Sequence, residues 1–212
     1  GFYEWGPWVN GGAWITTAVG KVDLIYRNID HVQQTITDAV NGIWHHHFDQ
    51  QPPYGFRSVI YLGETQVCRP LSDPGGVLQG LKEQITPYPV KLKQAIVSDC
   101  LWMAEFTFLQ CRQFASGGDA YNTVGCFTRI ANYLVHALFA INEVYPLGDK
   151  RAMQLINELG RSPLGAEQTL NRVLGQAGTD AQTLQASMEV LKALWAEVVD
   201  LTEGAHQPRF KV

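Results

Sequence analysis

The chain has 212 residues, of which 46% are hydrophobic and only 17% are charged. This composition provides enough apolar material for a core and excludes a disordered or highly charged chain. Sixteen Lys and Arg residues against 20 Asp and Glu residues give a net charge of −4. The balance argues against a protein that binds nucleic acid through a basic face.

The sequence carries no signal for a membrane or for secretion. No run of about 18 apolar residues is present, so we expect no transmembrane helix. The first residues, from Gly1 to Trp5, lack the basic stretch and the long apolar run of a signal peptide. We therefore expect a cytoplasmic protein.

The first part of the chain alternates β and α patterns. β-branched and aromatic residues with turn-forming glycines predict strands, and an Asn or Asp before a periodic stretch predicts a helix start. In chain order we expect β structure over 8–17, a strand over 21–27, a helix capped by Asn28 or Asp30 and ending at Val40, a loop over 44–55 and a strand over 56–62. This order predicts a small α/β unit over residues 1–70.

Residues 71–89 contain clusters of Pro and Gly and are predicted to connect two domains. From residue 90 the pattern is helical to the end of the chain. We expect helices over 91–115, 120–145 with Asp119 as cap, 149–160 with Asp149 as cap, 166–174, and 180–201. The predicted fold class is therefore α+β, with a partial α/β unit followed by an all-α helical bundle over 90–212.

The four cysteines show neither a Cys-x-x-Cys spacing nor a zinc-binding pattern. On a shared helix, Cys100 and Cys111 would lie about 16 Å apart, which is beyond the reach of a disulfide. We expect free thiols in a reducing cytoplasm.

Asp23 is the first candidate for a chemical role, because it lies between Val22 and Leu24 in a strand whose sequence pattern predicts burial. A buried carboxylate is costly unless it is paired, hydrogen-bonded or bound to a metal. Two interpretations stay open. Asp23 is either a surface residue paired with Lys21 or Arg27, or a metal ligand or general base.

Three runs carry a resemblance to a known family: NGGAW at residues 10–14, GKVDLIYRNID at residues 20–30, and the stretch from YGF to CRPL at residues 54–71. Together they resemble the latter half of a nucleotidyltransferase domain of the DNA polymerase β superfamily, in its bacterial, aminoglycoside-adenylyltransferase-like branch. Members of this branch carry a helical domain after the catalytic one, so the resemblance covers nearly the whole chain.

The family signature opens with a Gly-Ser or Gly-Gly turn, followed by an Asp-x-Asp pair that holds Mg²⁺ against the triphosphate; a third carboxylate on a later strand assists the attacking hydroxyl. Here Ile25 occupies the place of the second carboxylate after Asp23, and residues 13–17 read as a strand where the family has a helix. The resemblance therefore makes Asp23 the third carboxylate and a ligand of Mg²⁺. We expect either an upstream segment that bears the opening motif or a degenerate relative without activity of its own.

The predicted helix over 120–145 carries one polar stripe, formed by Asn122, Arg129, Asn132, His136 and Glu143. The stripe is a solvated edge, a buried polar network or the wall of a cleft. The resemblance implies the cleft, with Arg129 at the nucleotide. The spacing of Arg129 and His136 also fits HEPN-type ribonucleases.

Three further features are weighed for binding. Lys150 lies at a predicted helix start, where a cation and free backbone amides would meet phosphate, or else it is a solvated base after a capping Asp. Glu64 follows a predicted strand and is expected to face the cleft. His45, His46 and His47 point in different directions on an extended loop, so at most two reach one metal; otherwise they belong to a polar loop.

The resulting functional expectation is transfer of a nucleoside monophosphate, AMP from ATP, to a hydroxyl of a small-molecule acceptor with Mg²⁺. One alternative is a degenerate, antitoxin-like transferase that binds a protein partner. Another is a HEPN-like ribonuclease. A homodimer and a protein partner both stay open.

Overall fold

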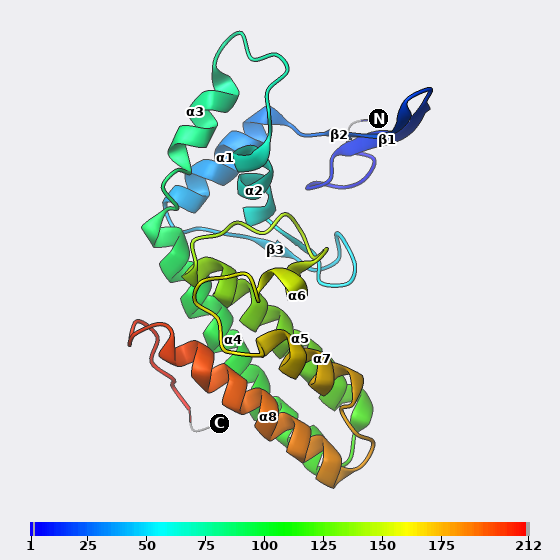
Figure 1. Ribbon diagram of the computed structural model, residues 1–212, viewed down its shortest axis with the longest axis vertical. Helices are drawn as coiled ribbons and strands as arrows, with labels where there is room; N and C mark the ends of the chain where they lie inside the picture. The colour runs from blue at the N-terminus through cyan, green and yellow to red at the C-terminus, as the bar shows by residue number, and fades with distance from the viewer. Residues whose placement is uncertain (2, 211–212) are drawn as a thin grey trace. The chain divides into compact units, whose positions relative to one another are not determined.

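The computed structural model describes residues 1 and 3–210 of the chain, which has a mixed α+β fold that is mostly helical (Figure 1). Two compact units divide it, Gly1–Leu92 and Lys93–Val212. The first contains the strands, and the second contains helices joined by turns.

The two N-terminal strands are present, as the sequence predicts, and the structure pairs them in an antiparallel hairpin. β1 (Gly11–Thr17) pairs with β2 (Gly20–Tyr26) in a register that places Trp14 opposite Asp23. The strands approach closely at Gly12, where an added Cβ would lie 2.0 Å from the carbonyl oxygen of Leu24. Glycine at this position therefore permits the hairpin to form. β2 is exposed along nearly its whole length, so the expectation that it is buried is wrong.

α1 (Ile29–Val40) follows the hairpin directly, and its expected cap is confirmed. The side-chain oxygen of Asn28 accepts hydrogen bonds from the backbone N–H groups of Asp30 (2.9 Å) and His31 (3.3 Å). These bonds satisfy two of the donors that a helix start leaves unpaired. The cap thus fixes the point at which β2 gives way to α1.

The strand predicted over 56–62 is wrong. β4 (Phe56–Arg57) has only two residues, pairs with β3 (His46–His47), and is followed by α2 (Val59–Val67). The cause is the continuous apolar run at 59–62, which suits a strand or a helix buried on all sides equally well. All four residues of this run lie in α2 and are buried.

The predicted connector over 71–89 also contains a helix, α3 (Val77–Gln84), which begins after Gly76 in a left-handed conformation with φ of 65°. α1, α2 and α3 pack against one another. Their common core includes the fully buried Ile36, Leu62 and Leu81.

The second unit is a helical bundle. Its helices are α4 (Val90–Ser116, whose first turn belongs to the first unit), α5 (Ala120–Ile141), α6 (Ala152–Leu155), α7 (Ala166–Gly175) and α8 (Ala181–Asp200). Asp119 caps α5 and Asp180 caps α8, as expected. Phe127, Leu170 and Leu191, from α5, α7 and α8, are fully buried in its core.

Two predicted helix bounds in this unit are wrong. α5 ends at Ile141 because Asn142 turns its side chain back to the Leu138 carbonyl (2.8 Å) and Glu143 adopts a positive φ of 58°. The helix predicted over 149–160 shrinks to the four residues of α6, and Arg151, not Asp149, precedes it. Ile156 is the one buried residue between 151 and 160, so too little apolar surface is covered there to hold a longer helix.

By length and composition alone, α5 is long and apolar enough to cross a membrane, and it is the one such helix among the described residues. In its most apolar stretch, 67% of the residues are buried within the protein, which is the environment of a core helix.

Candidate functional site

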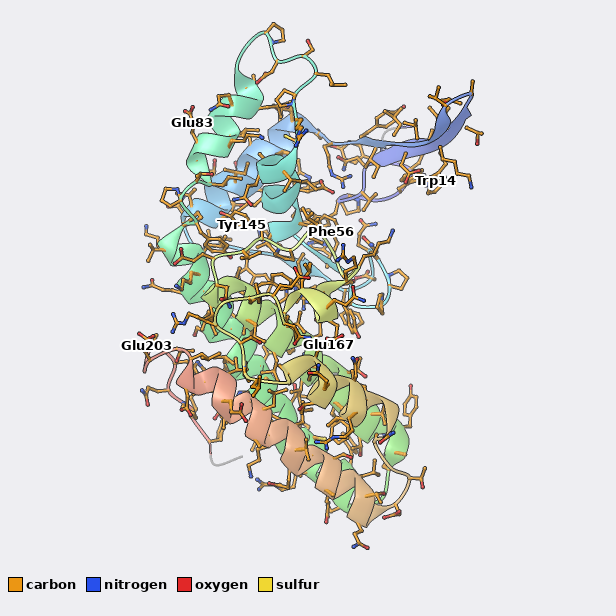
Figure 2. The ribbon with its side chains drawn as sticks, viewed as in Figure 1. Trp14, Phe56, Glu83, Tyr145, Glu167 and Glu203 are labelled. Atoms are coloured by element: carbon orange, nitrogen blue, oxygen red, sulfur yellow. The ribbon has the colours of Figure 1, made fainter. Side chains whose placement is uncertain are left out.

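Asp23 lies in the middle of β2 with its carboxylate exposed to solvent. Within the described part of the chain, it makes no hydrogen bond and no ion pair. The expected partner Arg27 is engaged elsewhere. Trp14 lies directly opposite, is 77% exposed, and stacks on Trp5 with ring centroids 4.8 Å apart (Figure 2). An unpaired carboxylate beside an exposed indole is therefore available to a ligand.

Glu64 is occupied by an ion pair that ties the end of the hairpin to α2. Arg27 donates from Nε to Oε2 (2.9 Å) and from Nη2 to Oε1 (2.7 Å), which is a two-point contact. The guanidinium also lies over the ring of Tyr61, 5.2 Å from its centroid. Such bidentate pairs are strong and geometrically specific, so this one serves to hold β2 in place. The structure thus gives Glu64 a positioning contact.

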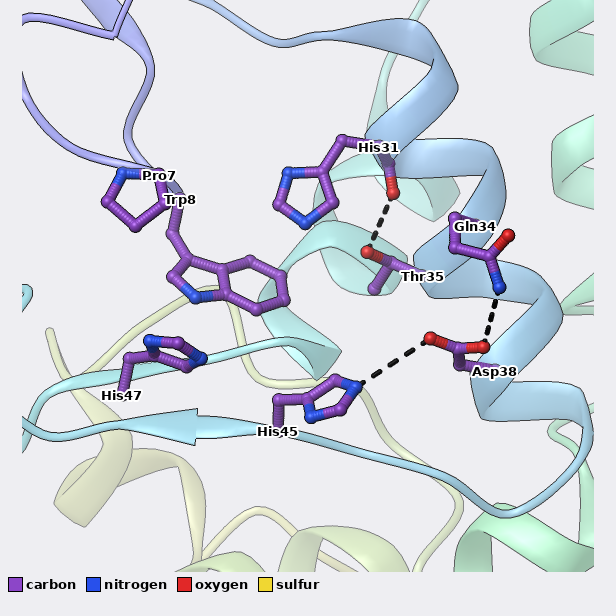
Figure 3. Close-up of a pocket in the computed structure, with 8 residues that line it drawn as sticks. All are labelled: Pro7, Trp8, His31, Gln34, Thr35, Asp38, His45 and His47. Atoms are coloured by element: carbon purple, nitrogen blue, oxygen red, sulfur yellow. Dashed lines mark hydrogen bonds and ion pairs between the residues drawn. The ribbon is translucent and has the colours of Figure 1, made fainter.

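A second feature of this unit is a small pocket, here called the histidine–tryptophan pocket, formed by Trp8, His31, Asp38, His45 and His47 (Figure 3). Pro7, Gln34 and Thr35 complete its lining, and its cavity volume is about 240 Å³. The imidazoles of His31, His47 and His45 have ring centroids 4.6, 5.3 and 6.2 Å from that of the indole. Three basic rings therefore surround one buried indole.

The surroundings of His31 favour its neutral form. Burial lowers the pKa of His31, and His45 and His47 lower it further, whereas Asp38 and the Pro7 carbonyl act in the opposite sense. Asp38 lies 3.7 Å from Nε2 of His45 and accepts a hydrogen bond from the Gln34 amide at 2.7 Å.

The three consecutive histidines separate as the extended backbone requires. His45 and His47 line the pocket, whereas Nε2 of His46 lies 2.5 Å from the Tyr54 carbonyl oxygen. Among the described residues, no three His, Cys, Asp or Glu side chains are arranged to hold a metal ion. The expectation that at most two of these histidines reach one metal is consistent with this arrangement.

The polar stripe predicted on α5 does not form one surface. Arg129 is exposed and lies 5.6 Å from the ring centroid of Tyr133, Asn132 is half-buried, and His136 is only 6% exposed. Glu143 lies beyond the end of α5 and binds Nζ of Lys93 at 2.9 Å. The stripe thus divides into exposed and buried residues.

Lys150 is exposed in a turn before α6. The helix start predicted at this lysine is absent, and α6 has only four residues. A single turn of helix presents too few aligned amides for the phosphate site expected here.

Sequence reasoning missed Trp8, His31 and Asp38 as a group. Two local signals were available: His45 and His47 alternate as strand residues on one face do, and His31 and Asp38 are two helical turns apart. Neither signal shows that these segments meet around Trp8.

Comparison with models of known protein families, with curated proteins and with solved structures finds no match to this chain. The fold and site define a mixed α+β protein with an exposed carboxylate on its hairpin and a separate pocket lined by histidines and Trp8.

Proposed function

We propose that the chain is part of a nucleotidyltransferase, with the hairpin and α1–α3 contributing to the catalytic domain. The reaction moves AMP from ATP to a hydroxyl of an acceptor, with Mg²⁺ neutralising the charge on the phosphates. Asp23 accepts the proton of the attacking hydroxyl or holds the metal ion. The Gly-Ser turn and the Asp-x-Asp pair that complete such a site are not in the printed sequence.

The observation that carries the proposal is the state of the Asp23 carboxylate. A residue that takes up a proton or a metal ion must be reachable and must not be neutralised by a neighbouring cation. Asp23 meets both conditions, because it is exposed and because, among the described residues, neither Lys21 nor Arg27 forms an ion pair with it; Arg27 is bound to Glu64. The capped junction between β2 and α1 holds the strand that carries it.

We retain the expected nucleotide and acceptor contacts only where the side chain is accessible. The residues in question are Arg129, Asn132, His136, Glu143 and Lys150. Arg129 and Lys150 are exposed and carry the positive charge that phosphate requires. His136 is buried, so we assign it no contact with substrate. The same burial weighs against a HEPN-like ribonuclease, whose histidine must reach RNA.

Exposed apolar residues on the hairpin favour a second function, binding of a protein partner. Trp14, Ile25, Val22, Ile15 and Leu24 are 77%, 50%, 46%, 44% and 42% exposed. The register places Trp14 and Ile25 on one face of the hairpin and Ile15, Val22 and Leu24 on the other, so both faces carry apolar surface of the kind that another protein segment covers. Either further residues of a catalytic domain or a separate partner chain would cover this apolar surface.

A transfer assay distinguishes the two functions. The complete product of the gene is incubated with ATP labelled at the α-phosphate, Mg²⁺ and a panel of hydroxyl compounds, and labelled AMP on the acceptor is measured. The transferase predicts labelled product that disappears when EDTA removes the metal. No product from any acceptor, together with a stable complex that Trp14→Ser dissociates, would instead support the partner-binding function.

A further inference from the structure

The histidine–tryptophan pocket has the size of a binding site for a small molecule. Its cavity of about 240 Å³ lies just below the range of roughly 300–1,000 Å³ that is usual for drug-sized ligands. Liquid water occupies about 30 Å³ per molecule, so the cavity holds more than a single water. The size therefore fits a ligand of few non-hydrogen atoms and excludes a nucleotide.

The indole wall of this pocket is held in place by contacts outside the cavity. Trp8 is only 4% exposed, and its backbone N–H donates to Oε1 of Gln50 at 3.2 Å. The hydroxyl of Tyr61 donates to the Trp8 carbonyl at 2.6 Å. The rings of Phe56 and Tyr61 pack against the indole, each with its centroid 5.4 Å away. A wall fixed in this way lowers the ordering cost that a ligand meets on binding.

The charge of the pocket comes from Asp38. Its described lining contains one carboxylate, that of Asp38, and neither lysine nor arginine. Burial lowers the pKa of His31 and so favours its uncharged ring. The guanidinium of Arg27 lies over the ring of Tyr61 nearby, but Glu64 neutralises it. The pocket therefore favours a ligand with a positive charge over one with a negative charge.

The Asp38 carboxylate also has room for a further hydrogen-bond donor. Its Oδ1 accepts a bond from the Gln34 amide at 2.7 Å, whereas Oδ2 lies 3.7 Å from Nε2 of His45, which is longer than a hydrogen bond (Figure 3). An ionised carboxylate offers about four lone-pair sites, and its partners among the described residues use few of them. The side chain is 24% exposed, so a ligand can reach it.

We propose that the histidine–tryptophan pocket binds a small primary ammonium ion. An ammonium group has three donors and no acceptor, which matches Oδ2 of Asp38 and the acceptor nitrogen of an uncharged imidazole. Its carbon chain lies against Pro7 and Trp8, and an indole attracts a cation within about 6 Å of its ring.

Other occupants fit the pocket less well. Phosphate or a carboxylate would meet the negative charge of Asp38, and among the described residues no three His, Cys, Asp or Glu side chains are arranged to hold a metal ion. The lining does not include Asp23, so ammonium binding is a property separate from nucleotidyl transfer.

Three four-carbon probes of different charge test the proposal on the full, unaltered chain. Butylammonium, 1-butanol and butyrate are titrated separately at pH 8, where histidine rings are in general uncharged and a primary amine is protonated. NMR follows the ring C–H signals of the histidines. We expect the dissociation constant of butylammonium to be at least tenfold lower than that of 1-butanol, and butyrate to give no saturable shift.

A pair of substitutions on α1 locates the site. Asp38→Asn removes the charge and keeps an oxygen for the Gln34 amide, so we expect butylammonium to bind at least tenfold more weakly. Asp30→Asn removes the same charge from an exposed position in the first turn of the helix, and we expect a change of less than twofold.

Two results would overturn the proposal. One is equal binding of the three probes, or no binding of butylammonium. The other is an unchanged dissociation constant in Asp38→Asn. The probe series needs no substitution, so it decides the matter even if Asp38→Asn does not fold.

Discussion

At the scale of single residues, the structure distinguishes carboxylates that hold the fold from the exposed carboxylate of Asp23. Glu64 and Asp38 both have partners, in Arg27 and in Gln34 with His45. Asp23 has none among the described residues, although its place in a strand of apolar neighbours indicated burial. The side chains of β2 alternate between two faces that are both exposed, because no second layer among the described residues covers the strand.

The histidine–tryptophan pocket predicts how stability depends on pH. Its surroundings lower the pKa of His31 below the ordinary value of 6.5, so the folded state favours the neutral ring. At a pH below 6.5 the unfolded chain binds more protons, and stability is therefore lost as the pH falls through the lowered pKa. We expect the urea midpoint of the first unit to be lower at pH 5 than at pH 7.5.

Substitution of His31 isolates this effect. In His31→Phe the ring that resists protonation is gone, so the fall in the midpoint between pH 7.5 and pH 5 should be smaller than in the unaltered chain. His46→Phe is the matched control, since His46 lies outside the pocket and contacts the Tyr54 carbonyl. Tryptophan fluorescence, to which Trp8 contributes, reports the unfolding transition. Equal pH dependence in all three proteins would exclude His31 as its source.

At the scale of secondary-structure elements, the sequence predicts those features, such as helix caps, that are made by residues close together in the chain. Asn28, Asp119 and Asp180 cap α1, α5 and α8 as expected, because a cap is made by side-chain bonds to residues two or three positions away. α2 could not be predicted in this way. Its apolar run at 59–62 shows no period, and burial on every side decides between helix and strand only in the folded protein.

The burial of α2 gives a stability prediction. Leu62 is completely buried, so Leu62→Ala removes packed atoms and leaves a cavity. We expect the free energy of unfolding of the first unit to fall by about 2 to 5 kcal/mol. Val67, at the end of the same helix, is 57% exposed, and Val67→Ala is expected to change it by less than about 0.5 kcal/mol. Urea unfolding measures both. Similar losses in the two variants would contradict the placement of Leu62 in the core.

At the scale of the whole molecule, composition and periodicity predict a mixed α+β chain whose second part is a helical bundle. The candidate site was less predictable. The carboxylate of Asp23 is visible in the sequence, but the histidine–tryptophan pocket joins Trp8, α1 and β3, and no spacing along the chain encodes such long-range contacts. The polar stripe on α5 was expected to share one surface, and the burial of His136 shows that helical spacing does not determine which positions face solvent.

The central claim is that Asp23 takes part in nucleotidyl transfer. The most direct measurement is the rate of labelled AMP transfer by the complete gene product carrying Asp23→Asn, compared with Asp49→Asn, which alters an exposed loop carboxylate. Removing a general base or a metal-holding carboxylate is expected to lower the turnover rate by about 10²- to 10⁴-fold, with the control unchanged. Undiminished turnover in Asp23→Asn would remove Asp23 from the mechanism.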